Sequence, residues 1–219
     1  MAPKIIVSYD GTDLDRDALA LGRLLSRAGA SLALAYVRHF TEAAAREQLA
    51  EHEAEELLVG GAAWLGDPGV PRFVVHSAST PEGLRDLAVK EEAEAIVFGS
   101  AYRTTPGHVY PQTSAERLLE GGPLAIAIAP AGFADGAIAS IAAVDEEGDT
   151  SAAQTAAALA ARLGATVESR PSPSAGFLVV GSKAGAARGT VLVSAASAYL
   201  VELSRCPVLV LRRGVPLGF

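Results

Sequence analysis

The residue types that carry most enzyme and metal chemistry are few in this chain and form no familiar catalytic pattern. The four histidines are scattered, and none stands four residues from another histidine or from the single cysteine, Cys206. This spacing argues against a metal site. The sequence has no Gly-x-Ser-x-Gly elbow, no Walker-type GK[ST] loop and no dinucleotide G-x-G-x-x-G loop. We therefore expect a non-catalytic protein without a metal site.

The remaining candidates stand at matching places in an internal repeat. Adding 135 to the residue number maps Asp10 on Asp145 and Gly29 on Gly164 without a gap. Further along, AIVFGS at 95–100 matches FLVVGS at 177–182 with an offset of 82. The difference, 135 − 82 = 53 residues, is what the second copy lacks. A repeat on this scale indicates a duplicated fold.

Short apolar runs alternate with helical patterns along the first copy. The runs at 4–9, 31–37, 72–76, 95–98 and 124–129 predict strands. Turn and helix-start residues follow several of them, such as the Asp-Gly-Thr-Asp at 10–13. Nearly continuous apolar strands between helices indicate βαβ units and a parallel sheet that is covered on both faces. The sequence therefore predicts an α/β fold.

The second copy predicts strands at 140–144, 165–168 and 177–180, but only the eight residues SRPSPSAG separate the last two. A long acidic helix, a third strand and the next helix are missing. Eight residues reach roughly 26–29 Å and a five-residue strand is about 17 Å long, so the strand at 165–168 should be short or irregular. We predict a complete domain at 1–131 and a shortened one at 138–219, joined by a linker of small residues.

Three features together resemble a tandem universal stress protein with a truncated second copy. They are VSYDGT at the end of the first strand, AIVFGS followed by a 13-residue loop into a helix, and the terminal CPVLVL strand at 206–211. The resemblance implies two Rossmann-like parallel-sheet domains of order 3-2-1-4-5, the second without strand 3 and its flanking helices. It also implies antiparallel pairing of the last strands, and binding of ATP with Mg in some members but not in others.

The family loop usually reads G-x2-G-x9-G-[ST], and its glycines let phosphate approach backbone N–H groups at a helix N-terminus. In the first copy these positions fall on Gly99, Tyr102, Gln112 and Thr113, of which only Gly99 and Thr113 match. Tyr102 and Gln112 put side chains where the family has none. Gly99, Ser100 and Thr113 are the candidate ligand residues of this copy.

In the second copy the motif falls on Gly181, Ala184, Ser194 and Ala195, so the replacements are small. Close approach of a ligand to the backbone therefore stays feasible, although the hydroxyl at the [ST] position is lost. The candidate ligand-binding residues of this copy are Gly181, Ser182, Ser194 and Ser197.

Three more positions match family ligand contacts. Asp10 and Asp145 would meet a ribose or a metal-bound phosphate; alternatively, both cap the following helix and tighten a turn. The backbone of Val37 would meet an adenine; alternatively, its side chain belongs to the core.

The composition limits the partners. The formal net charge is −7 and the pI is near 5.1, which argues against a nucleic-acid surface. One cysteine allows no intrachain disulfide. The sequence has no run of 18 apolar residues, which a membrane span would need. We expect a cytoplasmic protein, either a monomer with an internal pseudo-two-fold axis or a homodimer.

Three functions remain open at this stage. The first is a stress-response regulator that binds an ATP-like nucleotide or another small ligand. The second is an interaction module whose loops no longer bind nucleotide; it predicts that Tyr102 and Gln112 fill the first pocket and that the second loop is collapsed. The third, weaker one is a slow ATP hydrolase, for which the sequence offers no water-positioning residue.

Overall fold

The computed structural model describes residues 2–39, 44–168, 170, 172 and 175–219. In the first copy the elements are β1 (Lys4–Ser8), α1 (Asp13–Arg27), β2 (Ser31–Arg38), α2 (Ala44–Leu65), β3 (Arg72–His76), α3 (Thr80–Lys90), β4 (Ala95–Phe98), α4 (Thr113–Leu119) and β5 (Ala125–Ile128). In the second copy they are β6 (Ser140–Val144), α5 (Ser151–Leu163), β7 (Thr166–Glu168), β8 (Phe177–Val180), α6 (Ala195–Leu203) and β9 (Val208–Val210). The predicted α/β fold class is confirmed.

The strands form one mixed sheet of nine, in the order β3-β2-β1-β4-β5-β9-β8-β6-β7. Every pairing is parallel except β5 with β9, which is antiparallel. The antiparallel pairing of the last strands that the resemblance implies is present, and it joins the two parallel parts into one sheet. Pairing removes the exposed apolar edges that β5 and β9 would otherwise present.

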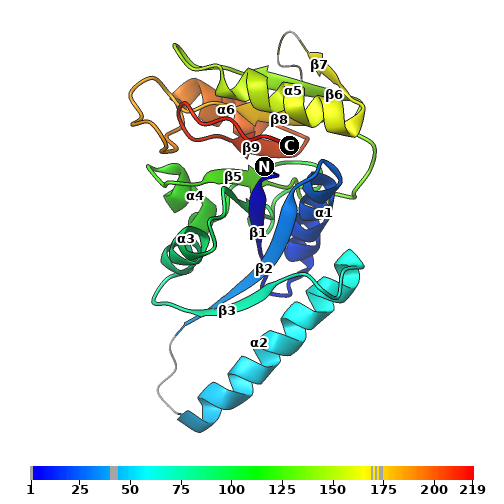
Figure 1. Ribbon diagram of the computed structural model, residues 1–219, viewed down its shortest axis with the longest axis vertical. Coiled ribbons are helices and arrows are strands. Elements are labelled where there is room, and N and C mark those ends of the chain that lie inside the picture. The colour runs from blue at the N-terminus through cyan, green and yellow to red at the C-terminus, as the bar shows by residue number, and fades with distance from the viewer. Residues whose placement is uncertain (1, 40–43, 169, 171, 173–174) are drawn as a thin grey trace.

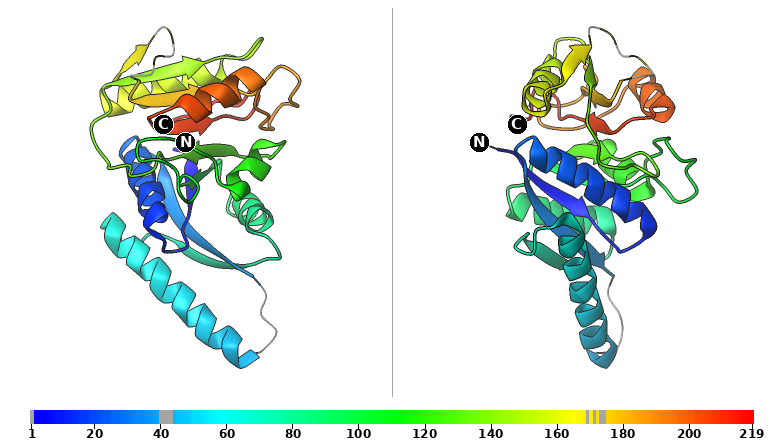
Figure 2. Two further views of the ribbon diagram at one scale, coloured as in Figure 1. Left: turned by 180° about the vertical axis from the view of Figure 1, so that it is seen from behind. Right: turned by 90° about the vertical axis from the view of Figure 1, so that its right-hand side faces the viewer.

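Helices cover both faces of the sheet (Figures 1 and 2). One buried apolar cluster joins the sheet to α1, α2 and α5, and the other joins it to α3, α4 and α6. Both clusters continue across the β5·β9 junction. The chain therefore has a continuous core on each face.

The second strand of the second copy, β7, is short. β7 has only three residues and lies at the sheet edge beside β6. Half of the eight residues that link it to β8 lie outside the described residues. The prediction of a short second strand is confirmed.

The linker between the copies is anchored to α1. Asp17, which is buried in α1, accepts a hydrogen bond from the Gly132 N–H at 2.8 Å. Arg23 and Arg27, also on α1, both donate to the Asp135 carboxylate.

In the part of the chain that the structure describes, no helix is both long and apolar enough to cross a bilayer.

Candidate functional site

Two loops follow β4 and β8 and lead into α4 and α6. We call residues 99–112 the first loop and residues 181–194 the second loop. They have the same backbone hydrogen bonds at an offset of 82. The Ala101 N–H donates to the Tyr110 carbonyl at 2.8 Å, and the Lys183 N–H donates to the Leu192 carbonyl at 2.9 Å. The two loops therefore have the same backbone conformation.

Each loop also has a glycine that the motif comparison missed. Gly107 has φ = 80° and Gly189 has φ = 84°, a left-handed conformation that favours glycine. Their N–H groups donate to Ala131 and Arg213, which follow β5 and β9. The signal was available in the sequence, since Gly107 and Gly189 match at the offset of 82.

The predicted ligand residues Ser100 and Ser182 are both buried and hydrogen-bonded within the fold. The Ser100 hydroxyl donates to the Ala129 carbonyl at 2.7 Å, and the Ser182 hydroxyl donates to the Leu211 carbonyl at the same distance. Each hydroxyl oxygen also accepts an N–H from its own loop. These hydroxyls fasten the loops to the last strands.

The two predicted glycines are buried where the loops leave their strands. The Gly181 N–H donates to the Val144 carbonyl at 2.9 Å. A Cβ at Gly181 would lie 3.5 Å from both the Val144 carbonyl oxygen and the Glu146 nitrogen, so the turn after β6 passes close by.

The end of the first loop is closed weakly. The Gln112 side chain donates to the Gly99 carbonyl across the loop, at 3.4 Å. Thr113 is exposed at the start of α4. The expectation that Tyr102 fills this pocket is wrong: its side chain is 77% exposed, and the Arg103 guanidinium lies over its ring at 5.4 Å.

The end of the second loop holds a carboxylate. Glu146, in the turn after β6, accepts hydrogen bonds from the Ser194 hydroxyl at 2.7 Å and the Ser197 hydroxyl at 2.8 Å. Ser194 is the N-cap of α6, and its hydroxyl oxygen accepts the Ser197 N–H at 3.1 Å. A helix N-terminus with two hydroxyl donors attracts an anion, and the chain supplies that anion itself. The interaction-module hypothesis predicts a collapsed second loop. The structure instead shows a loop that keeps its conformation and is closed by Glu146.

Sequence reasoning included Ser194 and Ser197 but missed Glu146. At the matching positions the first copy has Gly11 in place of Glu146, Gln112 in place of Ser194, and Ala115 in place of Ser197. The carboxylate and both of its donors therefore differ together between the copies. The repeat alignment contained this signal, because a glycine faces a glutamate next to the matched aspartates.

Asp10 lies beside a second acid that the sequence comparison missed. Asp15, in the first turn of α1, is buried and accepts the Asp10 N–H. Burial raises the pKa of Asp15 to about 8, and the neighbouring Asp10 carboxyl adds to this. Burial opposes ionisation of Asp10 too, but hydrogen bonds from Asp15 and Thr12 hold the pKa of Asp10 below its ordinary value. One proton is therefore held by this pair at neutral pH.

Asp145 is placed differently from Asp10. It is exposed, and its carboxylate accepts the Ala153 N–H of α5 at 2.9 Å. Asp10 instead accepts the Thr12 N–H at 3.1 Å within its turn. Both carboxylates contact the backbone around the following helix start, as the capping alternative expects. Their proposed contact with a ligand stays a prediction.

Val37 lies near the end of β2 and is partly buried. A Cβ added to Gly83 of α3 would stand 3.0 Å from a Val37 methyl carbon, so the side chain packs against that helix. The Val37 backbone contact with an adenine stays a prediction. No group of three or more His, Cys, Asp or Glu residues within the described ranges is arranged to hold a metal ion.

No family model matches the chain, and no curated protein matches it. Solved structures do. A universal stress protein from Archaeoglobus fulgidus is 13% identical, with a TM-score of 0.69, and the match covers 96% of this chain and 98% of that one. A universal stress protein described as putative, from Pseudomonas aeruginosa, is 14% identical, with a TM-score of 0.64, and the match covers 97% of this chain and 94% of that one.

A third structure, a protein of unknown function from Pseudomonas aeruginosa, gives a TM-score of 0.64 at 14% identity and covers 97% of this chain and 93% of its own. At such identities a likeness concerns the fold. All three matches extend over nearly the whole chain. The chain has the fold of the universal stress proteins.

Proposed function

We propose that the chain is a non-catalytic regulatory protein of the universal stress type, built as an intramolecular pseudo-dimer whose two phosphate-type loops are closed in the resting state. It acts through contacts with a partner or a small ligand rather than through bound ATP. The single observation that carries this proposal is the Glu146 carboxylate on Ser194 and Ser197.

An internal carboxylate is a strong competitor for a phosphate. A hydrogen bond to a charged group contributes about 1.5–3 kcal/mol, and a nucleotide would have to break two of them at Glu146. Each 1.4 kcal/mol is a factor of ten in affinity, so closure of the loop weakens anion binding by about tenfold or more. Phosphate also meets repulsion from the carboxylate until Glu146 swings away.

The first loop has neither of the two serine hydroxyls that contact Glu146 in the second loop. At the positions of Ser194 and Ser197 it has Gln112, whose amide is used on Gly99, and the buried Ala115. α4 has seven residues against nine in α6. The first loop therefore lacks the pair of hydroxyl donors that Ser194 and Ser197 form in the second loop, although Thr113 is exposed at the start of α4.

The pseudo-dimer is supported by the reciprocity of the junction. β5 and β9 pair about a centre at Ala127 and Leu209, which match at the offset of 82. Beside the strands, the Val191 N–H donates to the Gly122 carbonyl at 2.8 Å. The matching bond runs from the Val109 N–H to the Ser204 carbonyl at 3.2 Å. Such reciprocal contacts are typical of an isologous two-fold interface.

A second candidate is a nucleotide sensor in which ligand binding displaces Glu146. The specific observation in its favour is that the second loop keeps its backbone together with Ser194 and Ser197. Lys183 and Arg188, in the same loop, supply cationic groups.

Native mass spectrometry of the purified chain, with and without millimolar Mg-ATP, separates the two. A bare mass under both conditions is expected from the closed loops. A stoichiometric nucleotide adduct on the unaltered chain would overturn the proposal in favour of the sensor, and loss of that adduct in Ser194→Ala would place it at the second loop.

A further inference from the structure

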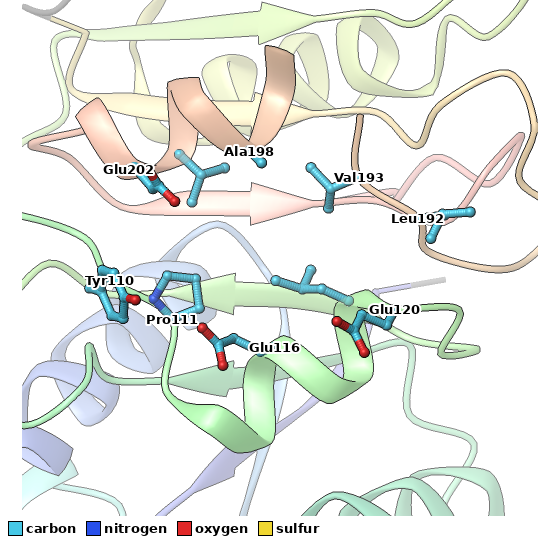
Figure 3. Close-up of a pocket in the computed structure, with 10 residues that line it drawn as sticks. Tyr110, Pro111, Glu116, Glu120, Leu192, Val193, Ala198 and Glu202 are labelled. Carbon is cyan, nitrogen blue, oxygen red and sulfur yellow. The ribbon is translucent and has the colours of Figure 1, made fainter. Parts of the chain in front are cut away.

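A groove of about 370 Å³ lies between α4 and α6, above the β5·β9 junction (Figure 3). Its lining repeats at the offset of 82. Three of the matching pairs are Tyr110 with Leu192, Leu119 with Val201, and Glu120 with Glu202. The other lining residues pair in the same way, so each copy contributes the same five positions. The groove therefore lies on the two-fold relation between the copies, and neither copy forms it alone.

The lining is mainly apolar. Leu119 comes from α4, Val201 comes from α6, and Leu192 and Val193 come from the second loop. At one end is Tyr110, whose side chain is 51% exposed. Ligand sites favour such concave surfaces between structural units, with apolar walls and a few polar groups that fix orientation.

The charged residues of the lining all have one sign. They are Glu116, Glu120 and Glu202, and no Lys, Arg or His is among the lining residues. Figure 3 shows Glu202 and Glu120 toward opposite ends of the groove, with Glu116 between them on the α4 side. All three are exposed, and no ion pair to them is seen among the described residues.

We propose that this groove binds a small organic dication, an aliphatic chain with an ammonium group at each end. The methylene chain would cover the apolar wall, and the ammonium groups would pair with Glu120 and Glu202 at the two ends. Tyr110 can contribute a cation–π contact at its end. Anions are repelled by the three carboxylates, and a bare metal ion gains nothing from the apolar wall, so the shape and charge select an amphiphilic cation.

The inference does not depend on whether either phosphate-type loop binds a nucleotide. None of the ten candidate ligand residues named from the sequence lines the groove. Its test can therefore fail while the proposed function stands, and the reverse also holds.

Isothermal titration calorimetry of the full chain at low salt tests the inference with α,ω-diaminoalkanes of four to ten carbons. At least one diamine should bind saturably, and about two- to fivefold tighter than the monoamine of the same length, because an exposed ion pair contributes up to about a factor of five. The diol of the same length should bind weakest. The affinity should fall as salt is added.

Variants locate the binding. Glu120→Gln and Glu202→Gln should each weaken the best diamine about two- to fivefold, and the double variant about tenfold. Glu55→Gln removes an exposed charge on α2 and serves as the matched control, with no effect expected. Ala198→Phe fills the groove and should abolish binding. Absence of saturable binding by every diamine, or equal effects of the double variant and the Glu55 control, would overturn the inference.

Discussion

The first and second loops share a backbone and differ in what closes them. In both, a buried serine and a left-handed glycine tie the loop to the last strand of its copy. In the second loop a carboxylate from the turn after β6 sits on two hydroxyls, whereas in the first loop a glutamine amide reaches across to a carbonyl. The comparison teaches that the residues which hold the loop in shape are the same in both copies, whereas the residues at the closed end of the loop differ as a group.

The largest expected effect concerns the junction that both copies share. Leu209 is fully buried at the centre of the β5·β9 pairing. Leu209→Asp should lower the free energy of unfolding by more than about 3 kcal/mol, because it buries an unpaired charge. Urea unfolding measures this. Val167→Asp, on the 47%-exposed site in edge strand β7, is the control and should cost under about 1 kcal/mol. Similar losses in the two variants would mean that the junction is not the centre of the fold.

The next prediction tests whether the buried serines stabilise the two loops equally. Ser100→Ala and Ser182→Ala each leave a buried carbonyl and a loop N–H without their partner. Each should cost about 1–3 kcal/mol, and the two costs should agree within about 1 kcal/mol. Chemical denaturation of both variants gives the answer. A cost confined to one serine would show that the loops are held differently.

The pH dependence of stability should distinguish the turn after β1 from the turn after β6. Asp15 has no acidic counterpart in the second copy, where the matching residue is Thr150. The pKa of Asp15 is about 8 in the folded chain, so the folded state binds a proton that the unfolded state releases. This contribution to stability is complete at pH below about 4 and is lost as the pH rises toward 8 and above.

Asp15→Asn mimics the protonated acid and should remove that loss. We expect the variant to gain stability relative to the unaltered chain between pH 5 and 9, by about 1 kcal/mol or more. Thermal unfolding across this range measures the difference. Asp86→Asn, at an exposed site on α3, is the control. A constant difference at all pH values would contradict the assigned proton.

The last comparison concerns the residues at the two helix starts, and it includes the smallest expected effect, that of Gln112→Ala. Ser194 caps α6 with its hydroxyl, whereas Gln112 makes no cap hydrogen bond to α4. Ser194→Ala removes the cap and one hydrogen bond to Glu146 and should cost about 1.5–3 kcal/mol, and Gln112→Ala about 0.5 kcal/mol or less. Denaturation curves of the two variants can be compared directly. The reverse order would mean that the first loop is the more tightly closed.

Much of the fold could be predicted from the sequence. The apolar runs at 4–9 and 95–98 became β1 and β4, because strands covered on both faces leave a plain signature. The shortness of β7 followed from the reach of the chain. The antiparallel pairing of β5 with β9 was expected from the resemblance and not from the apolar pattern, since the two strands lie about 80 residues apart in the sequence.

The candidate site was less accessible to sequence reasoning. A serine after a glycine at a strand end looks like a phosphate contact, and the sequence does not show that the Ser100 hydroxyl turns to a carbonyl 29 residues away. The contact of Glu146 with Ser194 and Ser197 spans 48 and 51 residues, beyond any local motif. Only the side-by-side reading of Gly11 with Glu146 could have exposed it.

The central claim, that Glu146 closes the second loop against phosphate, is tested most directly by Glu146→Ala. Nucleotide affinity can be measured by the thermal stabilisation that Mg-ATP gives the unaltered chain, this variant and the neighbouring control Glu147→Ala. The account predicts that Glu146→Ala binds at least about tenfold more tightly than the other two, and that adding Ser194→Ala reverses the gain. Equal affinity in all three proteins, whether weak or strong, would contradict it.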